Sequence, residues 1–189
     1  MDIPPQVVLT NHGDNEKSPL SICNAYAQLG ARGVPILYAS GDGGVSGNKA
    51  SDNRTEFVPV FPASCPYVTT PAYQSAAVAS YLSALGSNSS GLLNATGRAY
   101  PDVSAYGTQY DIESGAAALA VSGMSCSTPT FAAVAVLLNE SVQRGQERTP
   151  REQPACNGGT PGFHATQGWI PVTGLGTPNF TLLASAASL

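Results

Sequence analysis

The sequence predicts an α/β fold built around a parallel sheet. Two short apolar segments, Val7–Leu9 and Val34–Ala39, flank a stretch with helical periodicity, and strand, helix and strand in this order form a βαβ unit. A third apolar segment, Ala116–Val121, leads directly into a long apolar helix that begins near Ser125. With 42% hydrophobic and 11% charged residues, the 189-residue chain can fill the core of one domain.

The first predicted helix begins with Ser18 as its cap and runs to about Arg32, and glycines help to end it. Its apolar face includes Ile22, Ala25, Tyr26 and Leu29. The strand over 34–39 then runs straight into the glycine-rich segment Ser40–Gly44. Functional residues of parallel sheets gather at the carboxyl ends of the strands, which makes Asp42 a candidate site residue. A turn former flanked by glycines is the plainer explanation of the same aspartate.

Shorter elements follow along the chain. Phe57–Pro62 reads as an edge strand because of its prolines, and Ala72–Leu85 as a helix. The loop over 86–97 should be exposed. Tyr100–Gly107 and Ala116–Val121 are expected to be two further buried strands, and a short apolar helix should follow Asn179. The sequence contains no repeats, so we treat 1–189 as one domain.

Charge and hydropathy exclude several classes of protein. The formal charge of -4 and a pI near 4.9, without any basic cluster, argue against binding to nucleic acid or to anionic membranes. No apolar run is long enough for a transmembrane helix, and the first residues do not resemble a signal peptide. Five Asn-x-Ser/Thr tripeptides nevertheless favour a secreted glycoprotein; they begin at Asn53, Asn88, Asn94, Asn139 and Asn179.

The four cysteines are widely spaced and include no CxxC pair, so their pattern does not favour a zinc site. One or two disulfides can form among Cys23, Cys65, Cys126 and Cys156, and the sequence leaves the pairing open. We expect Cys126 to be a small buried side chain rather than a catalytic thiol.

Ser125 is the candidate nucleophile. It follows a glycine turn and lies at the start of an apolar helix, with Pro129 expected in the first turn. Unpaired N–H groups and the positive end of the helix dipole converge at such a position and favour negative charge. A serine that attacks a carbonyl there has part of its oxyanion hole built in. The alternative is a capped core helix in which these hydroxyls only satisfy backbone donors.

Four segments occur in the same order as in the sedolisins, the serine-carboxyl peptidases: Ser40–Asp42, Tyr100–Ser104, Gly123–Pro129 and Gly168–Phe180. This resemblance implies a subtilisin-like three-layer fold with a central parallel sheet, here incomplete at the N-terminal side. It also implies an acid-active peptidase with a Ser-Glu-Asp triad. Ser125 matches the nucleophile, and Asp42 matches the carboxyl of the oxyanion hole. Only a protonated carboxyl can donate a hydrogen bond to an oxyanion, which explains the preference for acid.

The chain departs from the sedolisin pattern at the general base. The family's Glu and Asp lie on a helix well upstream of Ser40–Asp42, and the printed chain starts too late to include it. Asp14 and Glu16 match a different family segment, so we expect neither to be the base. His12 and His164 lie in polar turns, and we do not expect a Ser-His pair.

Three smaller departures accompany this loss. The glycine-rich cleft segment that follows Val68 in the family is missing, and Met124 replaces the usual threonine. Sedolisins also bind calcium near the C-terminus. Here the expected aspartate is Ile170, which leaves backbone carbonyls around Thr166 and Gly168, and neutral oxygens alone should bind calcium poorly.

Two functions follow from the resemblance. The chain is either part of a secreted endopeptidase or tripeptidyl peptidase that acts on peptides or unfolded proteins, or a non-catalytic binding module of the same ancestry. A partner chain that supplies the missing strands would complete the sheet.

Overall fold

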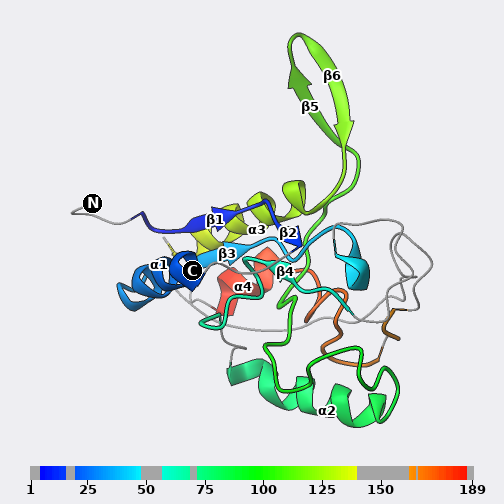
Figure 1. Cartoon of the computed structure of the whole chain (residues 1–189). Coiled ribbons are helices and arrows are strands. Elements are labelled where there is room, and N and C mark those ends of the chain that lie inside the picture. The colour runs from blue at the N-terminus through cyan, green and yellow to red at the C-terminus, as the bar shows by residue number, and fades with distance from the viewer. Residues whose placement is uncertain are drawn as a thin grey trace.

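The computed structural model describes residues 5–15, 20–47, 57–68, 72–139, 162–164 and 166–186. Figure 1 shows the order of the elements along the chain. The strands are β1 (Val8–Thr10), β2 (Asp14–Asn15), β3 (Ile36–Tyr38), β4 (Val60–Phe61), β5 (Tyr110–Ser114) and β6 (Ala117–Val121). The helices are α1 (Leu20–Ala31), α2 (Ser75–Leu85), α3 (Met124–Asn139) and α4 (Phe180–Ala186), with 3-10 turns η1 (Gly44–Ser46) and η2 (Ala72–Gln74).

The predicted βαβ unit is confirmed. β1 and β3 pair in parallel, with Leu9 opposite Leu37, and α1 connects them. α3 packs against both strands, so the helix that carries Ser125 lies directly on this pair (Figure 1). α1 buries Cys23 completely but leaves Ile22 43% exposed, so its packed face is narrower than its sequence predicts.

The predicted central sheet is not observed among the described residues. Their strands form three separate pairs, β1–β3, β2–β4 and β5–β6. The segment over 100–107, expected to be a strand, has no strand pairing. Its backbone instead bonds to the C-terminal loop: Leu175 N–H donates to the Asp102 carbonyl (2.8 Å), and Ser104 N–H donates to the Gly176 carbonyl (3.0 Å). Backbone N–H and carbonyl groups that would pair with a neighbouring strand therefore bond to the C-terminal loop.

The strand predicted over Ala116–Val121 forms, but it is exposed rather than buried. β6 pairs antiparallel with β5 in a hairpin that stands away from the rest of the chain (Figure 1). Gly115 (φ 59°) and Ala116 (φ 63°) both have positive φ, which gives the two-residue turn whose twist matches antiparallel strands. Side chains such as Leu119, 48% exposed, therefore face solvent.

α2 packs on the C-terminal loop through a cluster of Tyr81, Trp169 and Ile170, which are each at most 3% exposed. The Tyr81 and Trp169 rings meet edge to face with centroids 5.7 Å apart, and the Tyr81 hydroxyl donates to the His164 carbonyl (3.1 Å). The helices expected over 72–85 and after Asn179 are both present.

A disulfide joins Cys23 on α1 to Cys65 after β4, and both residues are buried. Cys126 is buried with a free thiol, as expected of a small core side chain. Cys156 lies outside the described residues. None of the helices in the described ranges has the length and apolar character needed to cross a bilayer.

Candidate active site

The loop before α3 is fixed by glycine geometry. Gly123 has φ 131°, a backbone conformation that residues with a side chain rarely adopt. Its N–H donates to the Gly107 carbonyl (2.8 Å). A Cβ at this position would lie 2.8 Å from Oδ2 of Asp42. Position 123 therefore needs glycine for two reasons, its backbone conformation and the close approach of the carboxylate.

α3 begins at Met124, one residue earlier than Ser125. Pro129 is consequently inside the helix and not in its first turn as its sequence predicts. Proline has no N–H to donate to the carbonyl four residues before it, which is that of Ser125. The helix remains continuous, and the Thr130 hydroxyl donates to the Cys126 carbonyl (2.8 Å) beside this gap.

Asp42 follows β3 and meets the start of α3. Its Oδ1 accepts a hydrogen bond from the backbone N–H of Met124 at 2.6 Å, although the two residues are 82 positions apart in the sequence. A carboxylate at a helix N-terminus satisfies a free donor and interacts favourably with the helix dipole. The structure thus brings together the two residues that the sequence singles out, since Asp42 contacts the residue that precedes Ser125.

The hydroxyl of Ser125 donates to the carbonyl of Asn11 at 3.4 Å. Asn11 follows β1, just as Asp42 follows β3, so the carboxyl ends of both parallel strands meet the N-terminus of α3. Ser125, Asp42 and Asn11 are all exposed and accessible from solvent. A peptide carbonyl cannot take up the serine proton, so this contact orients the hydroxyl but does not activate it.

Four other residues are candidate bases by residue type: His12, Asp14, Glu16 and His164. His12 is exposed and follows Asn11 directly, and Asp14 is exposed in β2. Glu16 lies outside the described residues. His164 is far along the chain, where its carbonyl accepts from Tyr81 of α2.

Met124 has a structural role that its sequence did not indicate. Its sulfur accepts hydrogen bonds from both the backbone N–H (3.1 Å) and the hydroxyl (3.3 Å) of Ser40. The signal in the sequence is weak, because a methionine before a serine gives no indication of a partner 84 positions away. Sequence reasoning also missed Asn11, because its main-chain carbonyl, and not its side chain, contacts the Ser125 hydroxyl.

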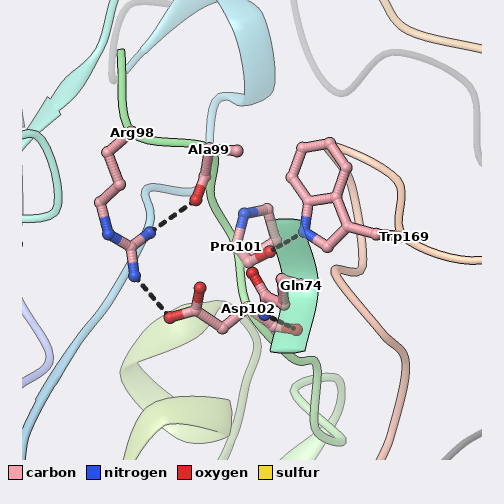
Figure 2. A network of polar contacts seen from close by, with 6 residues as sticks. All are labelled: Gln74, Arg98, Ala99, Pro101, Asp102 and Trp169. Atoms are coloured by element: carbon pink, nitrogen blue, oxygen red, sulfur yellow. Dashed lines mark hydrogen bonds and ion pairs between the residues drawn. The ribbon is translucent and has the colours of Figure 1, made fainter. Parts of the chain in front are cut away.

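The C-terminal loop is held by a polar network (Figure 2). The Trp169 indole donates to the Pro101 carbonyl (2.8 Å), and on the other side Arg98 forms an ion pair with Asp102 (2.6 Å). Buried Gln74 donates from its side chain to the Asp102 carbonyl (3.1 Å). The motif that contains Asp102 therefore has a structural role, which joins η2 to the loop around Trp169.

The same loop was expected to retain part of a calcium site at Gly168. Gly168 lies in an exposed turn, whereas Ile170 is 1% exposed and packs in the core. The N–H and carbonyl of Ile170 both bond to Gly174, at 3.2 and 2.9 Å. Over the described ranges no three His, Cys, Asp or Glu side chains are grouped as metal ligands. The described donors of this loop are neutral, and Thr166 offers one buried hydroxyl without a hydrogen-bond partner, whereas calcium prefers carboxylates among its oxygen ligands.

No family model matches the sequence. Individual relatives do. The chain is 35% identical to the "Probable tripeptidyl-peptidase SED3" of Trichophyton verrucosum (strain HKI 0517) over 95% of its length. It is 33% identical to the "Tripeptidyl-peptidase SED2" of Arthroderma otae (strain ATCC MYA-4605 / CBS 113480), again over 95% of its length. The chain belongs to the sedolisin family. This membership places it in a family of serine-type peptidases.

The chain spans 41% of the length of each of these two sedolisin relatives. Both alignments extend over 245 positions, at least 56 more than the 189 residues of the chain (245 − 189). The relatives therefore have segments within the aligned region that the present sedolisin chain lacks.

Proposed function

We propose that this chain provides the nucleophile and the oxyanion acid of a serine-carboxyl peptidase, with Ser125 and Asp42 in these roles. The observation that supports the proposal is the 2.6 Å hydrogen bond from the N–H of Met124 to Asp42 Oδ1. It links the aspartate at the end of one parallel strand to the residue directly before the serine.

The geometry suits acid chemistry at Asp42. One oxygen of the carboxyl accepts the Met124 N–H, while the other lies toward Gly123. On protonation the second oxygen can carry the proton and donate it to an oxyanion, and the first can still accept. Ser125 Oγ would attack a peptide carbonyl, form a C–O bond and lose its proton to a base, while the charge develops on the carbonyl oxygen.

We assign the base to a carboxylate that another polypeptide segment supplies. The contact that the Ser125 hydroxyl makes in the described structure is with the Asn11 carbonyl, which cannot serve as a base. β1 offers a place for such a segment, because Leu9 is 39% exposed. A partner chain would complete the catalytic set.

The names of these relatives favour a tripeptidyl peptidase over an endopeptidase. We take peptides or unfolded proteins as the substrate class. Secretion is supported by the exposed sequon residues Asn88, Asn94 and Asn179. The loop that contains the first two was expected to be exposed, and a glycan could be attached there without displacing buried side chains.

A peptide aldehyde tests the roles of both residues without requiring turnover. Attack by Ser125 Oγ forms a hemiacetal, with the serine proton transferred to the former carbonyl oxygen, and places that oxygen where the oxyanion would form. Binding should tighten as the pH falls, because the Asp42 carboxyl must be protonated to donate. Ser125→Ala should abolish binding, and Asp42→Ala should weaken it by about a hundredfold.

Asp42→Asn is the matched control, because an amide donates a hydrogen bond at any pH. This variant should bind the aldehyde with little dependence on pH. Hydrolysis of an unfolded protein is measured beside it between pH 3 and 7, the range over which ordinary carboxyls lose their protons. A folded chain whose aldehyde binding does not differ from that of Ser125→Ala would contradict the peptidase proposal.

A further inference from the structure

Met124 is bound to the Asp42 loop at both ends of that loop. Its backbone N–H donates to the carboxylate of Asp42, and its thioether accepts from the N–H and the hydroxyl of Ser40. Ser40 and Asp42 are separated by a single glycine. One residue at the start of α3 therefore holds a three-residue loop from both sides.

The two halves of this clamp depend on each other. If Ser40 moves away from the sulfur, the short loop moves with it and carries the Asp42 carboxylate away from α3. The loop lies tightly against β4, because a Cβ at Gly41 would lie 2.6 Å from Val60 Cγ2, and this close packing limits the room in which the loop can adjust. A thioether is a weak acceptor, but two donors converge on it.

We propose that Met124 is a positioning residue whose thioether holds Asp42 in place beside Ser125. The inference rests on the proposed role of Asp42. It also predicts a sensitivity to oxidants, since Met124 is only half-buried. A peroxide transfers one oxygen atom to the sulfur, so that the thioether becomes a sulfoxide and the peroxide is reduced to water or an alcohol. The added oxygen occupies the space between sulfur and Ser40 and forces the loop outward.

The chain is well suited to this test because it contains only two methionines, Met1 and Met124. Met124→Leu keeps nearly the same volume but removes the acceptor. Met124→Gln places an oxygen where the sulfoxide oxygen would lie, so it imitates the oxidised side chain, and it still leaves Met1 as an oxidation control. Ser40→Ala removes one of the two contacts and leaves the backbone donor.

The readout is the amide proton resonance of residue 124 in NMR spectra of the full chain. Asp42→Ala is introduced into each background, and the shift change that it causes measures the strength of the contact between Asp42 and residue 124. In Met124→Leu and in peroxide-treated wild type this change should fall below about half of its wild-type value. Met124→Gln should show the same loss before peroxide, and peroxide should cause no further change in it.

Aldehyde affinity gives the functional arm. We expect a loss of about tenfold in Met124→Leu, in Met124→Gln and in oxidised protein. If Met124→Leu does not fold, the oxidised wild type and Ser40→Ala provide the same comparison.

An unchanged Asp42 effect in Met124→Leu or in oxidised protein would overturn the positioning proposal. A failure of the proposed function gives a different result. The shift change caused by Asp42→Ala would still depend on Met124, but neither wild type nor any variant would bind the aldehyde.

Discussion

A methyl group at position 123 would collide with Asp42, which makes Gly123→Ala a direct test of the site. The Cβ would lie 2.8 Å from the carboxylate, and φ is 131°. We expect Asp42 to be displaced from α3 and aldehyde affinity to fall by at least about tenfold, as for the loss of an oxyanion donor.

Gly115→Ala is the matched control for this change. Gly115 also has positive φ (59°), but nothing lies within 4 Å of its Cβ position. This variant should lose about 1 kcal/mol of stability through backbone strain and keep its aldehyde affinity. If Gly115→Ala lowered aldehyde affinity as much as Gly123→Ala does, backbone strain and not the contact with Asp42 would explain the loss.

Arg98 and Asp102 form an ion pair that is largely removed from solvent, with side chains 12% and 32% exposed. Each also has a buried atom without a hydrogen-bond partner, Arg98 Nε and Asp102 Oδ1. Arg98→Met should lower the free energy of unfolding by about 2 kcal/mol, because a partly buried carboxylate loses its counter-charge.

Urea unfolding of the single variants and of Arg98→Met/Asp102→Asn checks this expectation. The second substitution removes the unpaired charge, so the double variant should be more stable than the sum of the two losses predicts. Strict additivity would mean that the pair contributes nothing beyond its separate contacts.

At the scale of elements, one covalent bond connects α1 to the turn after β4. Cys23 and Cys65 are 42 positions apart, and for a loop of this length chain entropy in the unfolded state gives a stabilisation of about 4 kcal/mol. Cys23→Ala/Cys65→Ala should lose roughly this amount.

Thermal unfolding with and without a reductant provides the measurement. Cys126→Ala is the control, because its thiol is buried and free, and reductant should destabilise this variant as much as wild type. Reductant should have no further effect on the double variant. A wild-type chain that reductant does not destabilise would contradict the expectation.

For the molecule as a whole, the sequence predicted local elements better than their environment. The βαβ unit, α2 and α4 could be predicted because periodicity and capping act within a few residues. The exposure of β6 could not be predicted, because the sequence pattern of an apolar strand is the same whether another element covers the strand or not. The segment over 100–107 lacks a strand because its hydrogen-bond partners, such as Leu175, lie in the distant C-terminal loop.

The same distinction applies to the site. Asp42 was singled out because it follows a strand of a parallel pair, and its pairing with Ser125 was what the resemblance to the sedolisins implied. The contact of Met124 with Ser40 and the choice of Cys23 and Cys65 as disulfide partners depend on the positions of distant segments. Residue types and local spacing do not determine such positions.

The tyrosines make alkaline pH a test of the whole fold. Burial raises the pKa of Tyr81 and Tyr100, and burial together with Tyr26 raises the pKa of Tyr38 to about 12, although Arg98 opposes this shift. The folded state therefore holds these protons more tightly than the unfolded state, where the value is 10.0. Their contribution to stability is fully present below about pH 10 and is lost as the pH rises toward 12.

Tyr38→Phe isolates this effect, because the ring stays and the titrating hydroxyl is removed. Between pH 10 and 12 the free energy of unfolding should fall less steeply in Tyr38→Phe than in wild type. Tyr67→Phe, at a residue that is 50% exposed, is the control for the removal of a tyrosine hydroxyl. Ultraviolet absorbance of tyrosinate reports the titration in the same samples. Parallel slopes for all three proteins would mean that Tyr38 ionises as readily in the folded chain as in the unfolded one.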